Sequence, residues 1–330
     1  MRPPDFWHHS PSHPLARLLT PAGALYGALT VRRMDRPGVQ ARCPVLCVGN
    51  FTLGGAGKTP TALALAKMLR DDLGRRPAFL SRGYGGTRPG PVAVDAARHS
   101  AADVGDEPLL LARFATTVVA RDRPAGAQLC NELGAEVIVM DDGLQNPSLQ
   151  KTLALAVVDA GAGLGNGLPF PAGPLRAPLA RQWRHIGGVV LIGDGAPGEA
   201  PAREAAARGL PVHRARLVPE APESWKDRPV VAFAGIGRPQ KFFGTLAGLD
   251  ARILATKSFS DHHPYRAGDL DALRALAQRE GAHLVTTEKD AVRLPAGERV
   301  DVLRVALAFD DPAALRGQLA EALTAPGRSP

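Results

Sequence analysis

A glycine-rich stretch carries the clearest chemical pattern in the sequence. In residues 46–69, LCVGNFTLGGAGKTPTALALAKML, an apolar run leads into a glycine loop and then into a helical stretch. Glycines let backbone N–H groups converge on phosphate oxygens, and the helix N-terminus adds partial positive charge. Lys58 would reach the β- and γ-phosphates, and the Thr59 hydroxyl would ligate Mg²⁺. We therefore predict an ATP site formed by Thr52, Leu53, Gly54, Gly55, Ala56, Gly57, Lys58, Thr59 and Pro60.

Two acidic residues are expected to complete this phosphate site. The segment EVIVMDDGLQN places Asp141 and Asp142 at the end of a predicted buried strand, where an aspartate without a partner would be costly. Mg²⁺ prefers hard oxygen ligands, so we predict that Thr59, Asp141 and Asp142 hold the metal. Thr52 stands where the phosphate-loop pattern has glycine, which leaves a chance glycine-rich turn as the alternative. The order of strand, loop and helix argues against that alternative.

Composition and charge narrow the possible partners. The chain has 40 Lys and Arg against 32 Asp and Glu, and its net charge of +8 suits an anionic partner such as a nucleotide or an anionic lipid. Arginine and aromatic residues are not interleaved as in RNA-binding surfaces, so no nucleic-acid partner is expected. Three cysteines give no disulfide framework, and a reducing compartment is expected. A monomer is the default expectation.

Residues 1–35 are predicted to form a helical segment at a membrane interface. Apolar residues recur at helical spacing within residues 14–33, and Thr20-Pro21 are suited to start a second helical piece. Preceding aromatic residues and closing arginines suit a membrane interface, whereas packing on the protein's own core is an equal alternative. No apolar run reaches the roughly 18 residues of a membrane span, and no signal-peptide pattern occurs. We expect the chain to stay on the cytoplasmic side.

The rest of the chain alternates β-branched runs with helical stretches, which implies parallel strands joined by right-handed crossovers. The predicted fold class is α/β, with a P-loop NTPase-like, doubly wound, mainly parallel sheet and a second, smaller α/β domain. We place the first domain at residues 36–150, completed by a C-terminal helix at about 310–330. The second domain is placed at residues 151–309, where it would close over the active-site cleft.

Eight sequence blocks together resemble the tetraacyldisaccharide 4'-kinases of lipid A biosynthesis. They are GNFTLGGAGKTP, SRGYGG, VGDEPLLLA, DDGLQN, GNGLPFPAGPLR, GIGRPQKFF, DHHPY and TTEKDAVRL, and they follow the family order. Thr52 is itself a feature of this family. The resemblance implies ATP- and Mg²⁺-dependent phosphorylation of the 4'-hydroxyl of a tetraacyldisaccharide 1-phosphate at the cytoplasmic face of the inner membrane. It also implies a membrane-associated N-terminal helix and a two-stranded linker between the domains.

The resemblance also implies catalytic roles. A sugar hydroxyl is a poor nucleophile at neutral pH, so a positioned group should accept its proton. By resemblance, Asp106 of VGDEP is this base, His262 of DHHPY pairs with it, and Lys58 completes the catalytic set. From the residues alone, Asp106 is more typical of a helix N-terminus, and the His262-His263 pair is more typical of a surface turn.

Four residues are candidates for contacts with the substrate. Arg82 and Arg123 are expected near strand ends, where their forked donors suit phosphate or sugar, and structural arginines are the equal alternative. Gln145 and Asn146 follow the aspartate pair. Asn146 stands where the family commonly has histidine, and Ala177 stands where it commonly has an acidic residue. Both departures would alter substrate contacts.

Two other functions fit part of the sequence. A P-loop kinase for another anionic metabolite would use the same loop and aspartates, but it would leave the N-terminal segment without a role. A nucleotide-dependent switch would use hydrolysis to change conformation. Its GTPase form should carry an N-K-x-D segment, which the sequence lacks. A dinucleotide-binding fold is excluded because SRGYGG does not extend to G-x-G-x-x-G.

Overall fold

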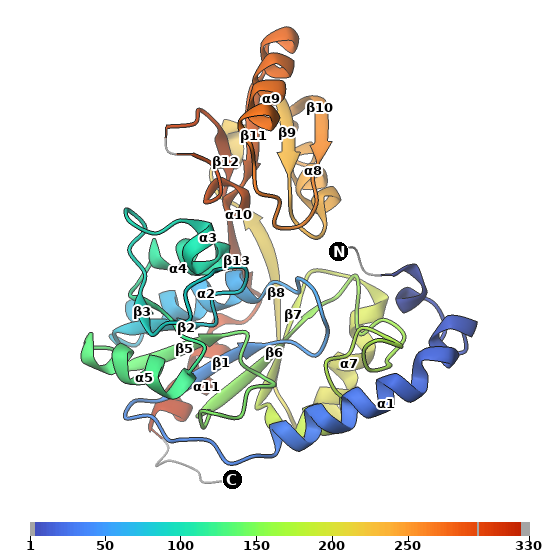
Figure 1. The fold of residues 1–330 in the computed structure, drawn as a ribbon, viewed down its shortest axis with the longest axis vertical. Coiled ribbons are helices and arrows are strands. Elements are labelled where there is room, and N and C mark those ends of the chain that lie inside the picture. The colour runs from blue at the N-terminus through green and yellow to red at the C-terminus, as the bar shows by residue number, and fades with distance from the viewer. Residues whose placement is uncertain (1–3, 296, 325–330) are drawn as a thin grey trace.

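The computed structural model describes residues 4–295 and 297–324, whose strands form one sheet of nine strands and one of four (Figure 1). The strands of the larger sheet are β1 (Val45–Gly49), β2 (Pro77–Ser81), β3 (Val92–Ala93), β4 (Thr117–Val119), β5 (Val137–Asp141), β6 (Leu153–Asp159), β7 (Gly188–Ile192), β8 (Val212–Pro219) and β13 (Val305–Phe309). Their order is β13-β8-β7-β6-β1-β5-β2-β4-β3. Neighbouring strands are parallel except at the two edges, where β3 pairs with β4 and β13 with β8.

Helices cover both faces of the larger sheet. The helices outside the smaller domain are α1 (Pro14–Met34), α2 (Lys58–Asp71), α3 (Ala101–Val104), α4 (Asp106–Ala112), α5 (Arg123–Glu132), α6 (Leu179–Gln182), α7 (Ala196–Ala207) and α11 (Pro312–Thr324), with 3₁₀ helices η1 (Asp5–His8) and η2 (Trp183–His185). One face packs against α2, α4 and α11 through side chains such as Leu65, Leu111 and Leu315. The other packs against α5 and α7 through Cys130 and Ala205. This arrangement confirms the predicted doubly wound α/β fold.

The smaller sheet stands above the larger one in Figure 1. Its strands are β9 (Pro229–Ala234), β10 (Arg252–Ser258), β11 (His283–Thr287) and β12 (Asp301–Leu303), in the order β10-β9-β11-β12, and its helices are α8 (Pro239–Ala247), α9 (Ala267–Glu280), α10 (Glu288–Ala291) and η3 (Pro222–Ser224). All its strand pairs are parallel. Phe242 of α8 fills the core on one face, and Leu270 of α9 fills it on the other.

The chain crosses between the sheets twice. It leaves the larger sheet after β8 and returns between β12 and β13, and β8 and β13 pair antiparallel with Val305 opposite Pro219. The run VDVLRVAL at residues 300–307 is rich in β-branched and apolar residues and by itself predicts one strand, but the structure divides it between two strands of different sheets. Arg304 separates them because the chain changes sheet at that point.

The strand pairing differs from the predicted boundary after residue 150. Strands β6, β7 and β8 extend the larger sheet beyond β1, and the smaller sheet begins only at Pro229 of β9. The same alternation of strand and helix produces both sheets, so the sequence pattern does not reveal which sheet edge a new strand joins. Helix α11 packs on the larger sheet through Leu315 and Leu319.

Helix α1 is one continuous helix, so the predicted restart at Pro21 is wrong. Thr20 donates its hydroxyl hydrogen to the carbonyl oxygen of Ala16, and the helix continues to Met34. The buried side of α1 is lined by small residues. A Cβ at Gly23 would lie 2.8 Å from the carbonyl oxygen of Pro169, so the backbones approach closely there. Among the described residues, no helix is long and apolar enough to cross a membrane.

Candidate active site

The glycine loop connects β1 to α2, as predicted. Gly57 has φ 92°, and a Cβ there would lie 2.5 Å from Ile192 Cδ1, so both its conformation and its surroundings require glycine. At Gly54 and Gly55 a Cβ would meet nothing within 4 Å. The loop therefore has open space beside its backbone, and α2 begins at Lys58 with its N-terminus next to that space.

Residues 174–176 hold this loop in place. Leu53 donates its N–H to the carbonyl oxygen of Pro174 at 2.8 Å, and Arg176 Nε donates to the carbonyl oxygen of Thr52 at 2.9 Å. Sequence reasoning gave Arg176 no role. Arg176 does belong to GNGLPFPAGPLR, one of the blocks that carry the family resemblance. The resemblance therefore pointed to this segment, but it did not show that Arg176 contacts the glycine loop.

Asp142 connects the two cations of the loop. Its carboxylate accepts hydrogen bonds from Arg176 Nη1 and Nη2 at 2.8 and 3.0 Å, and Lys58 Nζ lies 3.7 Å from Oδ2. Burial opposes ionisation of Asp142, but Lys58 and Arg176 together hold its pKa below the usual value. Asp142 has φ 55°, a strained conformation of the kind that collects at functional sites. The site thus fixes two positive charges beside the phosphate loop.

Asp141 is the less satisfied member of the aspartate pair. It ends β5 beside Val48 of β1 and is 4% exposed. Burial raises its pKa to about 7, against the opposing effect of Lys58. Within the described residues its Oδ1 has no hydrogen-bond partner. A buried, unpartnered carboxylate oxygen suits a hard cation such as Mg²⁺, so the residues present fit the predicted metal.

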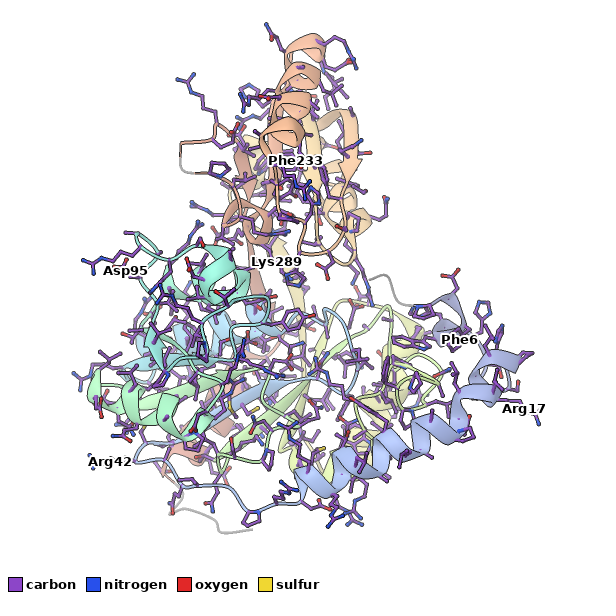
Figure 2. The ribbon with its side chains drawn as sticks, in the orientation of Figure 1. Phe6, Arg17, Arg42, Asp95, Phe233 and Lys289 are labelled. Atoms are coloured by element: carbon purple, nitrogen blue, oxygen red, sulfur yellow. The ribbon has the colours of Figure 1, made fainter. Side chains whose placement is uncertain are left out.

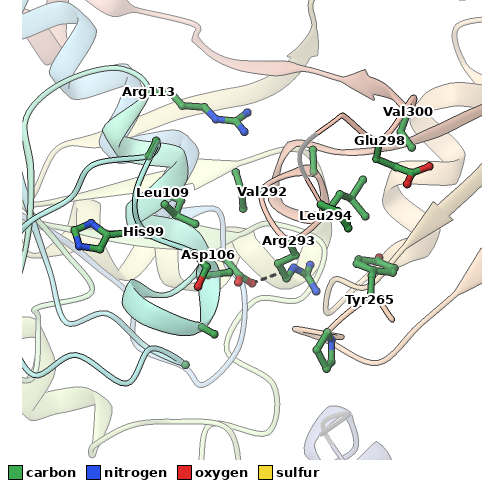
Figure 3. A pocket seen from close by; sticks show the side chains of 18 of the residues that line it. His99, Asp106, Leu109, Arg113, Tyr265, Val292, Arg293, Leu294, Glu298 and Val300 are labelled. Carbon is green, nitrogen blue, oxygen red and sulfur yellow. Dashed lines mark ion pairs between the residues drawn. The ribbon is translucent and has the colours of Figure 1, made fainter. Parts of the chain in front are cut away.

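A second cluster lies between the two sheets. Asp106 begins α4 and is 5% exposed, and its Oδ2 lies 2.8 Å from His262 Nδ1. Arg293 Nε lies 3.2 Å from the same oxygen (Figure 3). These three residues line a cavity of about 980 Å³. His262, like Asp142, has a positive φ, at 57°.

Glu107 links the second cluster to the phosphate loop. It follows Asp106 in α4, and its charge acts on both Lys58 and Asp141. Burial lowers the pKa of Lys58, whereas Asp142, Asp141 and Glu107 oppose that effect. Residues that sequence reasoning placed in separate motifs therefore share one electrostatic environment.

The four candidates for substrate contacts have different surroundings. Arg82 is exposed after β2, whereas Arg123 is buried and donates to the carbonyl oxygen of Ala120. Burial lowers the pKa of Arg123 to about 10, and the nearby Arg82 also lowers it. The predicted contacts of both arginines with the substrate stay predictions.

Gln145 and Asn146 make hydrogen bonds within the chain. Gln145 Nε2 donates to the Asn50 carbonyl oxygen and to Gln182 Oε1, each at 2.9 Å. Asn146 Oδ1 accepts from the N–H of Ser148 at 2.9 Å and so forms a local turn. Their predicted contacts with the substrate also stay predictions.

Another polar contact joins the sheets. Asp159, at the end of β6, accepts from Arg238 Nη1 at 2.8 Å and also pairs with Lys241 of α8. Sequence reasoning missed this contact because 79 and 82 positions separate Asp159 from its two partners in the chain. Together with Asp106 and His262, it holds the smaller sheet over the ends of the strands that carry the phosphate loop.

A mainly parallel, doubly wound sheet with a glycine loop running into a helix and an aspartate pair on the next strand defines a nucleotide-binding protein of the P-loop class. The family model for tetraacyldisaccharide-1-P 4'-kinase matches residues 15–324. The chain belongs to this family, which is a family of phosphotransferases that act on a hydroxyl group in lipid A biosynthesis. This confirms the family resemblance and the predicted enzyme class.

Similar proteins and a solved structure agree with this assignment. A tetraacyldisaccharide 4'-kinase of Methylorubrum extorquens (strain PA1) is 72% identical over 98% of this chain and 99% of that protein. One of Rhodopseudomonas palustris (strain BisB5) is 53% identical over 97% of this chain and 96% of that protein. The crystal structure of LpxK from Aquifex aeolicus in complex with ATP is 26% identical, covers 94% of this chain and 99% of that one, and has a TM-score of 0.75.

Proposed function

We propose that this protein transfers the γ-phosphate of ATP to the 4'-hydroxyl of a tetraacyldisaccharide 1-phosphate at the cytoplasmic face of the inner membrane. Family membership and the names of its relatives support the reaction. The observation that carries the mechanism is the proximity of the two clusters: Glu107, next to Asp106, also acts on Lys58 and Asp141. This supports the proposal that the nucleotide-holding lysine and the candidate base belong to one site.

Residues 52–60 would hold the nucleotide. Amide groups of the loop and the N-terminus of α2 would face the phosphates, and Lys58 would neutralise their charge. Asp142 forms ion pairs with both Lys58 and Arg176 and would keep these two cations beside the loop. Thr59, Asp141 and Asp142 would hold Mg²⁺, which would withdraw charge from the phosphate oxygens when bound.

Asp106 would act as the general base. His262 and Arg293 both contact its Oδ2, which leaves Oδ1 as the oxygen that would face the acceptor. The 4'-hydroxyl would give its proton to Asp106 while its oxygen forms the new bond to the γ-phosphorus, and the bond to the β-phosphate oxygen would break to release ADP. His262 would hold the carboxylate in the orientation that this transfer requires.

Arg82 is the candidate best placed to bind the sugar or its phosphate, because it is exposed. Tyr84, two residues further on, lies edge-on to His262 with ring centroids 5.6 Å apart. The segment that carries Arg82 therefore approaches the proposed base. Arg123, Gln145 and Asn146 are further candidates for contacts with the substrate.

The exposed face of α1 supports binding to the membrane surface. Leu18, Leu25 and Leu29 are 74%, 64% and 61% exposed, although small residues of the same helix are buried. A helix that hides its small side chains and exposes leucines is the reverse of an ordinary surface helix, and it suits insertion into the edge of a bilayer. Such a position would bring the site close to an acylated substrate.

The decisive experiment is incubation with Mg-ATP and a tetraacyldisaccharide 1-phosphate in mixed micelles. The expected result is a bisphosphorylated lipid formed by the natural protein and absent with Lys58→Ala. ATP consumption without phosphorylated lipid would contradict the proposed function and would favour a nucleotide-dependent switch. Phosphorylation of a soluble sugar phosphate in preference to the lipid would favour a kinase for another metabolite.

A further inference from the structure

Lys289 occupies the junction between the two sheets, where Figure 2 labels it. It belongs to the short helix α10, and its Nζ lies 2.9 Å from Glu107 Oε1 and 3.2 Å from His262 Nε2. One lysine of the smaller sheet therefore contacts an acidic residue of the larger sheet and the histidine that pairs with Asp106. Sequence reasoning gave Lys289 no role.

The chemistry of the ammonium group fixes the direction of these hydrogen bonds. An ammonium has three donors and no acceptor, so Nε2 of His262 must be the acceptor. In a neutral imidazole the other nitrogen then carries the proton, and Nδ1–H donates to Asp106 Oδ2 at 2.8 Å. A proton on Nε2 would instead point at the ammonium.

We propose that Lys289 is a positioning residue that holds His262 in the Nδ1–H tautomer, so that the ring donates to Asp106 Oδ2 and Oδ1 stays available for the acceptor hydroxyl. This inference rests on the proposed role of Asp106 as the base. It assigns to Lys289 a function through His262 rather than a contact with the substrate.

A buried network anchors the helix that carries Lys289. Asp290 is 0% exposed and accepts hydrogen bonds from the Gly235 N–H at 2.8 Å, the Tyr265 hydroxyl at 2.6 Å and Thr287 Oγ1 at 2.6 Å. Burial and the charge of Asp290 both raise the pKa of Tyr265, so its hydroxyl keeps the proton that it donates. Helix α10, which carries Lys289, is therefore held firmly in place.

Arg293 lies four residues beyond Lys289 and points toward Asp106 (Figure 3). It is held by Asp290 at 2.7 Å and reaches Asp106 at 3.2 Å, and its side chain is 4% exposed. Two cations spaced four residues apart thus face Asp106 and Glu107, which are consecutive in α4. The contact of Arg293 with Asp106 therefore helps to fix the position of Lys289 relative to Asp106.

Several charged groups surround His262, and their contacts bear on whether this cluster holds a metal ion. Besides Asp106 and Lys289, Asp261 Oδ1 lies 3.9 Å from Nε2. Asp106, Glu107 and His262 also present ligand atoms within 4.8 Å of one another, a spacing compatible with a metal. The ammonium group of Lys289 already contacts two of these three residues, Glu107 and His262. We therefore infer an ion-paired network here and not a metal site.

The test combines the ring tautomer with kinetics. Protein labelled with ¹⁵N in histidine would be compared with Lys289→Met, which removes the donor, and Lys289→Gln, whose amide still donates. A His262→Gln spectrum would assign the signal, and Lys257→Met, an exposed lysine on β10, would be the matched control. ¹⁵N shifts distinguish the two neutral tautomers in the whole protein without substrate.

We expect the natural protein to show the Nδ1–H tautomer and Lys289→Met to show loss of that single form. In Lys289→Met, kcat should fall about 10–100-fold, as for other residues that orient a catalytic group, with KM for ATP within about twofold. Lys289→Gln should recover the tautomer and most of kcat, which a merely structural defect would not allow. Lys257→Met should match the natural protein.

Three results would each overturn the inference: the Nε2–H tautomer in the natural protein, an unchanged tautomer in Lys289→Met, or an unchanged kcat in that variant. The spectra decide the matter even if the lipid is not phosphorylated. In that case the proposed function fails, while the tautomer measurement still tests the contact of Lys289 with His262.

Discussion

His262 Nδ1 lies 2.8 Å from Asp106 Oδ2, although 156 positions separate the two residues in the chain. Asp106 belongs to a helix on the larger sheet, and His262 follows a strand of the smaller sheet. The proposed base is therefore complete only while the two sheets are held together. The proposed chemistry therefore depends on how the sheets are arranged, through this hydrogen bond and through the contacts of Arg293 with Asp106 and of Lys289 with Glu107.

Replacing either member of this pair should slow turnover without unfolding the protein. Asp106→Asn removes the proton acceptor, and His262→Ala removes the group that orients it, so each should lower kcat by about 10²-fold or more. Steady-state phosphorylation of the lipid would measure this loss. Asp271→Asn, at an exposed position on α9, is the control and should retain normal turnover. A near-normal kcat in Asp106→Asn would show that Asp106 is not the general base.

The open space at Gly55 gives a second prediction. A methyl group there would meet no protein atom within 4 Å, so Gly55→Ala should leave the melting temperature of the free protein nearly unchanged. The same methyl group would occupy space proposed for the phosphates, and affinity for ATP should fall about tenfold or more. Calorimetric titration would measure it. Gly268→Ala on α9 is equally unhindered and should bind ATP normally.

Most of the fold follows from sequence periodicity, and its departures have physical causes. The elements predicted between residues 44 and 140, four strands and three helices, lie within about two residues of β1, α2, β2, α4, β4, α5 and β5, because buried β-branched runs and amphipathic stretches differ in period. The short elements β3 and α3 were not predicted. Helix α7 was not predicted. Pro201 lies inside it and Pro197 lies in its first turn, and two prolines close together disfavour a helix on local grounds alone. Burial of Ala202 and Ala205 against the sheet stabilises it.

The candidate site was predicted unevenly for a similar reason. Lys58, Thr59 and Asp141 belong to local patterns whose chemistry can be inferred from spacing. Arg176 and Lys289 act across distances that no spacing rule covers, since their partners come from other elements of the fold. A sequence shows which side chains suit a reaction, whereas the sheet topology decides which of them meet.

The leucines of α1 give a third prediction. Replacing Leu18, Leu25 and Leu29 with glutamine should lower the fraction bound to vesicles that contain anionic phospholipid, because each exposed leucine is expected to contribute roughly 1–2 kcal/mol of apolar burial. Cosedimentation would measure the fraction. The control is a triple replacement of exposed leucines elsewhere, at Leu133, Leu217 and Leu254. Equal binding of both variants would refute a membrane-binding role of α1.

The raised pKa of Asp141 predicts how stability depends on pH. Its usual value is 3.8, and burial raises the folded-state pKa to about 7. Between these values the folded protein binds more protons than the unfolded chain, so stability falls as pH rises through this window. Asp141→Asn removes the buried charge and keeps the shape of the side chain. Its stability advantage over the natural protein should therefore grow from about pH 5 to about pH 8 by on the order of 2 kcal/mol.

Urea unfolding without nucleotide and with a chelator would measure this difference, because a bound cation would mask it. The same substitution should abolish phosphorylation of the lipid if Asp141 holds the metal, so stability and activity should change in opposite directions. Asp72→Asn, at an exposed position after α2, should show neither effect. An advantage that stays constant or shrinks with rising pH would show that Asp141 is not held at a raised pKa. In that case a cation site would no longer explain why Oδ1 of Asp141 lacks a hydrogen-bond partner among the described residues.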